Sequence, residues 1–231
     1  MGLTVHHLQV SQSERIPWLC EELGIPYALK TYARSPLLSP PAYLALHPIG
    51  AAPVITDPDT DLTLAESNAV AEYIIHVYGG GELTLTPGEA DYAAYLYWLH
   101  FTNGTLQPAV GRILVVRGAG LDEDNNLRAR YEARLARALA HLDARMVATG
   151  AWLAGEAFTV ADVMVVFSLT TMRRFVPLDL SQYQGILGYL ERVAMRPAYV
   201  SAMEKGDPGM DWRAAMHGPP PELFGALRAK V

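Results

Sequence analysis

The sequence predicts an α/β domain built as βαβ followed by ββα, and then an all-helical domain. Two observations carry this prediction. In residues 1–80, short β-prone runs alternate with segments whose apolar residues recur every three or four positions. From Pro87 onward the helical spacing continues and no convincing strand pattern appears. A chain of 231 residues is long enough for two small domains.

The elements of the first domain begin with a strand. Residues 4–8 predict this strand, residues 13–23 a helix and residues 27–32 a second strand. Pro17 falls in the first turn of the helix, where its missing N–H costs least, and Gly24 ends it. A strand, a helix and a strand in this order favour a parallel pair of strands.

A hairpin and a helix complete the first domain. Residues 53–56 and 62–64 are short apolar runs separated by an Asp-rich turn, which predicts two antiparallel strands. The helix expected over 67–78 ends at three successive glycines. We therefore expect the first domain over 1–80 and a linker over 81–88.

The remaining residues, 89–231, predict the helical domain. Its longest helix is indicated by apolar residues in steps of three or four between Leu127 and Met146. A Gly-, Asp- and Asn-rich segment over 118–126 predicts a loop before this helix. After Gly206 the chain is Pro-rich and irregular, with a short helix expected near its end.

Composition limits the possible classes of partner. The chain carries 24 acidic and 18 basic residues, a net charge of −6, and no basic cluster, which argues against nucleic acid and anionic membranes. Charged residues make up only 18%, so we expect part of the surface to be hidden in a subunit interface. The first residues lack the features of a secretion signal, which predicts a cytoplasmic protein.

Neither the cysteine nor the histidines indicate a metal site, and we expect no metal. Cys20 is the single cysteine and lies among apolar residues of the expected first helix, so we interpret it as a core residue rather than a reactive thiol. His6 and His7 are adjacent on a strand and point to opposite faces, so they cannot share one metal ion.

Three motifs, in this order along the chain, resemble the cytosolic glutathione transferase superfamily. They are SQSER at 11–15 with EELGIPY at 21–27, HPIGAAPVI at 47–55, and LAESNAV at 64–70. The resemblance covers nearly the whole chain. Within the superfamily, the motif residues are similar to those of the serine-type fungal and bacterial transferases, a group with theta-like and nitrogen-regulator-like members. It implies a thioredoxin-like first domain that binds glutathione, and a homodimeric enzyme.

The resemblance implies glutathione contacts for five residues. Pro53 would form a cis peptide bond with Ala52, and the backbone of Val54 would then pair with the cysteinyl part of glutathione. Ser67, at the start of a helix, would bind the γ-glutamyl carboxylate, and Glu66 would meet its ammonium group. Two plainer interpretations stay open: Pro53 starts an ordinary strand, and Ser67 is only an N-cap.

Either Ser11 or Ser13 would contact the glutathione thiol. The thiolate is the nucleophile, so a hydroxyl near the helix N-terminus must donate a hydrogen bond to sulfur. By its position in the family motif Ser11 is the catalytic candidate, whereas Ser13 is the alternative or only the N-cap of the helix. The absence of cysteine at both positions argues against mixed-disulfide reductase chemistry.

The helical domain would hold the electrophile. The run FTVADV at 158–163 resembles the family's buried capping box, formed by Thr159 and Asp162. The candidate residues for the electrophile pocket are Tyr95, Trp98, Phe101, Gln107 and Arg112, with Phe224 from the tail. At this spacing the aromatic residues also fit a plain helix core.

The implied function is that of a glutathione S-transferase, with glutathione as co-substrate and a small hydrophobic electrophile as partner, as in detoxification. Ala51 and Ala52 stand where many relatives carry Lys or Gln for the glycyl carboxylate, so weaker glutathione binding is expected. Two alternatives stay open: a glutathione-dependent isomerase or natural-product tailoring enzyme, and a noncatalytic ligand-binding or regulatory protein.

Overall fold

The computed structural model describes residues 2–228, which form two compact units. Unit 1 holds the chain up to residue 84, together with 193–212 and the segment from 225. Unit 2 holds residues 85–192 and 213–224. The predicted order, an α/β domain followed by a helical one, is confirmed.

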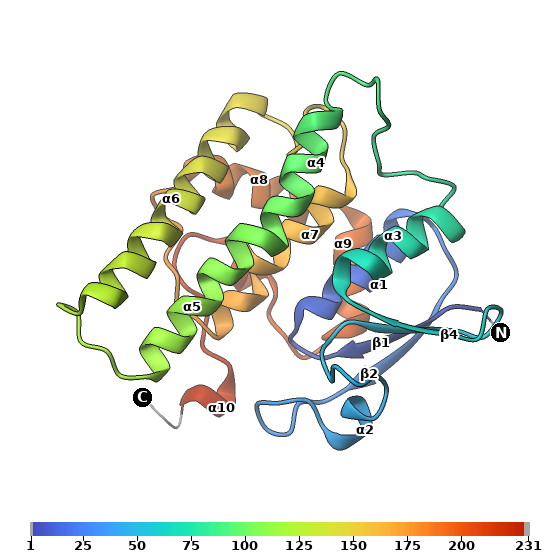
Figure 1. Ribbon diagram of the computed structural model, residues 1–231, viewed down its shortest axis with the longest axis horizontal. Coiled ribbons are helices and arrows are strands. Elements are labelled where there is room, and N and C mark those ends of the chain that lie inside the picture. Colours follow the sequence, from blue (N-terminus) through green and yellow to red (C-terminus); the bar gives the residue numbers. More distant parts are fainter. Residues whose placement is uncertain (1, 229–231) are drawn as a thin grey trace. The chain divides into compact units, whose positions relative to one another are not determined.

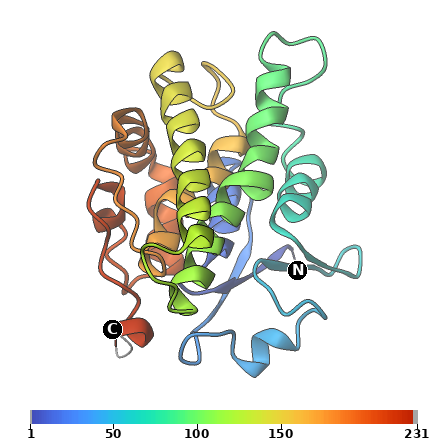
Figure 2. The same cartoon turned by 60° about the vertical axis from the view of Figure 1, so that its left-hand side comes forward.

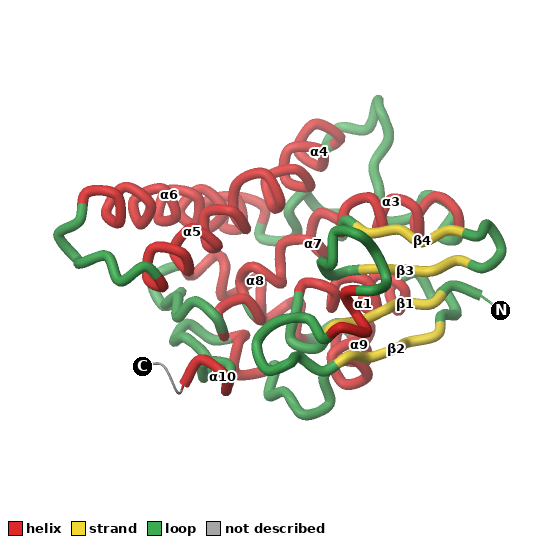
Figure 3. Tube along the Cα trace, turned by 60° about the horizontal axis from the view of Figure 1, so that its bottom comes forward, coloured by secondary structure: helices red, strands yellow, loops and turns green. Residues whose placement is uncertain are grey.

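Unit 1 is built on a four-stranded mixed sheet in the order β2-β1-β3-β4. Its strands are β1 (Thr4–Leu8), β2 (Ala28–Tyr32), β3 (Val54–Asp57) and β4 (Leu62–Ala65), which lie side by side in Figure 3. β1 and β2 are parallel, whereas β3 pairs antiparallel with both β1 and β4. The predicted βαβ unit and the predicted hairpin are both confirmed.

Two helices cover one face of this sheet and a shorter helix lies on the other (Figure 1). α1 (Arg15–Glu22) continues a 3-10 turn, η1 (Gln12–Glu14), and packs beside α3 (Ser67–Val77). α2 (Pro41–Leu44) lies between β2 and β3, where a proline opens the helix. Its Tyr43 is fully buried in the core cluster on that face.

α9 (Pro197–Gly206) belongs to unit 1, although the sequence assigns it to the helical domain. It packs along α1, where the rings of Trp18 and Tyr199 meet edge to face with centroids 4.8 Å apart. Arg196 donates two hydrogen bonds of 2.6 Å to the carboxylate of Glu22. These partners are far apart in the sequence, so residue spacing gives no sign of them.

Unit 2 is helical. Its helices and turns are α4 (Tyr92–Phe101), η2 (Thr102–Leu106), α5 (Gln107–Gly118), α6 (Asn126–Thr149), α7 (Val160–Leu169), η3 (Thr171–Arg174), α8 (Gln184–Ala194) and η4 (Arg213–Met216). α6, yellow-green in Figure 2, runs beside the green α5. A last short helix, α10 (Gly225–Arg228), follows η4.

A single turn of π-helix, η2, joins α4 to α5 without breaking the helical run. Pro108 has no N–H to give to the carbonyl of Gly104, so the regular pattern cannot continue there. The N–H of Gln107 instead donates to the carbonyl oxygen of Thr102, five positions back.

α7 begins with the predicted capping box. Asp162 accepts a hydrogen bond of 2.9 Å from the N–H of Thr159, whose side chain accepts in return from the backbone of Asp162. The other carboxylate oxygen accepts from the N–H of Leu153 at 2.9 Å. Every residue of α7 is buried, and this burial raises the pKa of Asp162 to about 6.

Three further expectations concern the membrane, metal and cysteine. Among the described residues, no helix combines the length and apolarity needed to cross a membrane. Within residues 2–228, no group of three or more His, Cys, Asp or Glu side chains is arranged to hold a metal ion. Cys20 is fully buried, and burial, with the nearby Glu21 carboxylate, raises the pKa of its thiol to about 12, as expected for a core residue.

Candidate functional site

A chain of hydrogen bonds in unit 1 joins the three motif segments. Gln12 Nε2 donates to the carbonyl oxygen of Ala52 at 2.7 Å, and Gln12 Oε1 accepts from Arg15 Nη1 at 3.0 Å. The same guanidinium nitrogen lies 3.4 Å from Ser67 Oγ at the start of α3. The three segments therefore meet at one end of the sheet, where β1 ends, β3 begins and β4 ends.

Arg15 occupies the middle of this chain and is fully buried. Burial lowers the pKa of its guanidinium to about 9, an effect that the Glu14 carboxylate opposes, so the side chain stays charged at neutral pH. The planar, multiply donating guanidinium suits a residue that must hold Gln12 and Ser67 together.

Ser11 and Ser13 share a dense set of buried hydrogen bonds. Ser11 Oγ donates to the carbonyl oxygen of Leu8 at 2.7 Å, accepts from the N–H of Ser13 at 3.2 Å and lies 2.8 Å from Ser13 Oγ. Ser11, not Ser13, is therefore the N-cap, because the helical run opens with a 3-10 turn at Gln12, earlier than the sequence indicates. Of the two serines only Ser11, at 4%, has any exposed surface.

The residue before Ser11 has a strained backbone. Val10 has a φ of 53°, a left-handed value that is unfavourable for a β-branched residue. Its N–H donates to Asp207 Oδ1 at 2.9 Å, and its carbonyl oxygen accepts from Arg34 Nη2 at 2.8 Å. Contacts from both sides thus hold the turn that presents Ser11.

His7 connects β1 to Ser13 and to Asp207. Its Nε2 lies 3.0 Å from Asp207 Oδ2, its Nδ1 lies 2.9 Å from Ser13 Oγ, and all three side chains are buried. A serine, a histidine and an aspartate also form a hydrolase triad, but there the serine bonds Nε2 and the aspartate Nδ1, the reverse of the arrangement here. Ser13 moreover has no exposed surface, so the arrangement offers no accessible nucleophile.

The Ala52–Pro53 peptide bond is cis, as the family resemblance implies. Val54 opens β3, is fully buried, and pairs with His6 on one side and Ala65 on the other. Ala52, on the other side of the cis bond, takes part in the site through its carbonyl oxygen, which accepts from Gln12. The contact of either backbone with glutathione stays a prediction.

Glu66 and Ser67 form the start of α3. Glu66 is the N-cap, with a φ of 74°, and its exposed side chain makes no capping hydrogen bond. Ser67 is the first residue of the helix and is buried, so the N-cap interpretation of Ser67 is wrong by one position. The N–H groups at this helix start favour an anion.

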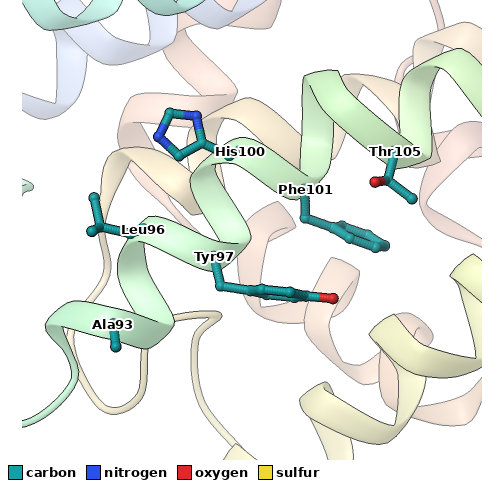
Figure 4. A pocket seen from close by; sticks show the side chains of 6 residues that line it. All are labelled: Ala93, Leu96, Tyr97, His100, Phe101 and Thr105. Atoms are coloured by element: carbon teal, nitrogen blue, oxygen red, sulfur yellow. The ribbon is translucent and has the colours of Figure 1, made fainter.

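Three of the five candidates for the electrophile pocket line different recesses of unit 2. Phe101 lines a recess of about 490 Å³ along α4 (Figure 4), Trp98 lines a second and Arg112 a third. Tyr95 is buried, as a core residue would be, and the half-buried Gln107 opens α5. Their role in binding an electrophile stays a prediction.

Sequence reasoning missed four polar residues of this site: Gln12, Arg15, His7 and Asp207. Arg15 carries a local signal, because it stands four positions before Leu19 and so on the apolar side of the expected helix. Asp207 carries none, since it is 200 positions away from His7.

Comparison with known proteins covers most of the chain. Residues 11–77 match the family model described as glutathione S-transferase, N-terminal domain, and residues 86–197 match that of the C-terminal domain. Over 219 residues the chain is 31% identical to glutathione S-transferase 3 of Schizosaccharomyces pombe, covering 88% of this chain and 87% of that protein.

Solved structures show the same likeness. A glutathione S-transferase from Actinobacillus pleuropneumoniae matches with a TM-score of 0.81 and 32% identity, covering 91% of this chain and 95% of that chain. A glutathione transferase from Pseudomonas putida, with one glutathione disulfide bound per subunit, shares the fold at a TM-score of 0.72 and 23% identity, covering 90% and 92%. Since both halves of its length match, the chain belongs to the cytosolic glutathione S-transferase superfamily of enzymes.

Proposed function

We propose that the chain binds glutathione at the end of the sheet where the motif segments meet, and that Ser11 stabilises the glutathione thiolate. The observation that carries this proposal is the hydrogen-bonded chain from Ala52 through Gln12 and Arg15 to Ser67. It joins the segments to which the family resemblance assigns glutathione contacts. The glutathione disulfide in the Pseudomonas putida relative supports the same class of ligand.

The tripeptide lies along these segments in the proposed complex. The backbone around the cis bond, from Ala52 to Val54, meets the cysteinyl part, and the start of α3 with the Ser67 hydroxyl receives the γ-glutamyl carboxylate. The exposed carboxylate of Glu66 meets the γ-glutamyl ammonium group. Ala51 is exposed and uncharged, so the glycyl carboxylate gains no ion pair there.

Ser11 acts on the sulfur. Its hydroxyl proton turns from the carbonyl oxygen of Leu8 to the thiolate, and the N-terminal end of the helical turn adds positive potential. The thiolate then forms below the pH of about 8.5 at which a free thiol titrates. It attacks an electrophilic carbon, forms a sulfur–carbon bond, and displaces a leaving group or adds to a double bond.

The partner in this reaction is a small apolar electrophile held by the helical unit. The candidate contacts remain Tyr95, Trp98, Phe101, Gln107 and Arg112. The low share of charged residues, 18%, supports a homodimer, and detoxification in the cytoplasm is the role that fits this chemistry.

Titration with glutathione tests the role of Ser11. The ultraviolet absorbance of the thiolate is followed as pH rises, in the wild type, in Ser11→Ala and in Ser35→Ala, a control at an exposed serine of unit 1. We expect the thiol pKa of bound glutathione to rise by about one unit in Ser11→Ala, through loss of one hydrogen bond to the anion, and to stay unchanged in the control. An unchanged pKa in Ser11→Ala would remove the catalytic role of Ser11.

A conjugation assay with a chloro-nitroaromatic compound separates the possible functions. A stable conjugate identifies a transferase. Recovery of free glutathione beside an altered second substrate identifies an isomerase or a tailoring enzyme. Binding of glutathione without any turnover, over a panel of electrophiles, identifies a noncatalytic ligand-binding protein.

A further inference from the structure

A second set of buried hydrogen bonds joins the end of α9 to residues 7–10, which directly precede Ser11. Asp207 follows the last residue of α9 and is only 3% exposed. Its Oδ1 accepts from the N–H of Val10 at 2.9 Å, and its Oδ2 lies 3.0 Å from His7 Nε2. Gln9 Nε2 donates to the carbonyl oxygen of Gly206 at 3.2 Å. The end of α9 is therefore hydrogen-bonded to the residues that directly precede Ser11.

The Asp207 carboxylate fixes the direction of the protons in this set. In the tautomer of His7 that donates from Nε2 to the Asp207 carboxylate, Nδ1 is left as an acceptor. Ser13 Oγ, 2.9 Å from Nδ1, then donates its single proton to His7 rather than to the carbonyl oxygen of Leu8 at 3.2 Å or to Ser11 Oγ at 2.8 Å.

Ser11 then holds the one hydroxyl proton of the pair that is free to turn. Inside the protein it has two alternative acceptors, the carbonyl oxygen of Leu8 at 2.7 Å and Ser13 Oγ at 2.8 Å. A bound thiolate is a third acceptor and, being charged, the strongest of them.

We propose that Asp207 and His7 are positioning residues that make Ser11 the hydrogen-bond donor to the glutathione thiolate. The inference rests on the proposed function and deepens it. Asp207 does this in two ways. It holds Val10 in its left-handed conformation, and it orients His7 so that Nδ1 accepts the hydroxyl proton of Ser13.

Packing at Gly206 holds the imidazole in place. A Cβ at this position would lie 3.1 Å from His7 Nε2 and 3.3 Å from Cδ2, closer than side chains normally approach. Gly206 does not have a positive φ, so glycine is needed here for space rather than for backbone conformation. Gly206→Ala therefore displaces His7 without removing any polar group.

Three variants separate the parts of the set. Asp207→Asn removes the charged acceptor, and His7→Gln keeps a donor for Asp207 but leaves Ser13 without its acceptor. Gly206→Ala moves the ring. Asp59→Asn, at an exposed turn of the same unit, is the matched control for a lost carboxylate.

Two measurements are made on each folded variant. The first is the thiol pKa of bound glutathione, with kcat and KM. The second is hydrogen exchange of the Val10 amide without glutathione, which reports the turn independently of any chemistry. We expect all three variants to raise the thiol pKa by about one unit and to lower kcat about tenfold at neutral pH, with little change in KM for glutathione. Exchange at Val10 accelerates in Asp207→Asn and is unchanged in His7→Gln.

The outcomes that overturn the inference differ from those that overturn the proposed function. A wild type that forms thiolate while Asp207→Asn and His7→Gln form it equally well overturns the inference alone. A wild type that binds glutathione without lowering its thiol pKa overturns the proposed function, and the inference with it. If Asp207→Asn does not fold, His7→Gln and Gly206→Ala decide the question.

Discussion

Two buried aspartates hold the start of a helical segment, one in each unit, and they do so over very different sequence distances. Asp162 accepts from the N–H of Thr159, three positions away. Asp207 accepts from the N–H of Val10, 197 positions away, and bonds to His7, 200 positions away. The local pair caps a core helix, whereas the distant one holds a strained turn at the candidate glutathione site.

This difference indicates what the loss of each carboxylate should affect. Asp162 stands in a helix whose every residue is buried, so its loss should lower the free energy of unfolding. Asp207 stands beside the turn that carries Ser11, so its loss should change the properties of the bound thiol. Variants of both kinds of contact test this division between stability and function.

The largest effect is expected for Asp162→Ala. The variant leaves the buried N–H groups of Leu153 and Thr159 without an acceptor, at about 1 to 3 kcal/mol each, so we expect the free energy of unfolding to fall by about 3 kcal/mol. Denaturant unfolding at pH 7 measures it, with the exposed Asp124→Ala as control. A loss equal to that of the control would contradict the capping role.

The next largest effect should be the contribution of Asp162 to the pH dependence of the free energy of unfolding. Its pKa is raised from 3.8 to about 6 in the fold, so between these values the folded protein keeps a proton that the unfolded chain has released. This contribution stabilises the fold at low pH and is lost as pH rises through about 6.

The measurement compares the wild type with Asp162→Asn, which cannot titrate. Between pH 4 and pH 7 the unfolding free energy of the wild type should fall relative to the variant by about 2 kcal/mol. A difference between the two proteins that stays constant over this range would show that Asp162 keeps an ordinary pKa.

Arg15→Lys should separate the effect of the positive charge at this position of unit 1 from the effect of the planar guanidinium. Lysine keeps a positive charge beside Glu14 but loses the planar group that reaches both Gln12 and Ser67. We expect glutathione affinity to fall about tenfold, or about 1.4 kcal/mol. Calorimetric titration measures the affinity, and Arg130→Lys, at an exposed position of α6, is the control. Equal affinity in both variants would show that Arg15 does not organise the site.

Thr159→Ala tests the other half of the capping box. Loss of an N-cap hydroxyl costs about 1 kcal/mol, less than the loss of the Asp162 carboxylate, because only one of the two reciprocal contacts goes. Denaturant unfolding at pH 7 checks this, and Thr159→Ser, which keeps the hydroxyl, should stay close to the wild type. A serine variant as unstable as the alanine variant would assign the effect to the lost methyl group instead.

The sequence predicted the features that depend on near neighbours. The hairpin follows from residues a few positions apart, whereas the cis bond at Pro53 and the box of Thr159 and Asp162 were implied by motifs shared with the family. The N-cap at Ser11 was missed for a local reason: the helical run opens with a 3-10 turn, whose period differs from the 3.6 residues of an α-helix.

The features that the sequence did not predict depend on distant partners. α9 packs in unit 1 through aromatic contacts such as that of Tyr199 with Trp18, and no periodicity reveals such a partner. The same holds for Asp207, which is an ordinary acidic residue after a helix until the fold brings it to His7. Long-range polar contacts of this kind require the three-dimensional structure.

The smallest effect is expected at Ala51, one of the two positions where the family resemblance implies a Lys or Gln. An exposed lysine there would add an ion pair to the glycyl carboxylate of glutathione, and such exposed pairs contribute about 0.2 to 1 kcal/mol. We therefore expect Ala51→Lys to lower the dissociation constant of glutathione about twofold to fivefold, and 0.5 M salt to cancel most of that gain. Ala51→Met, of similar length but uncharged, is the control in the same titration. Tighter binding in both variants would point to apolar contact, and no change in either would place the glycyl carboxylate away from Ala51.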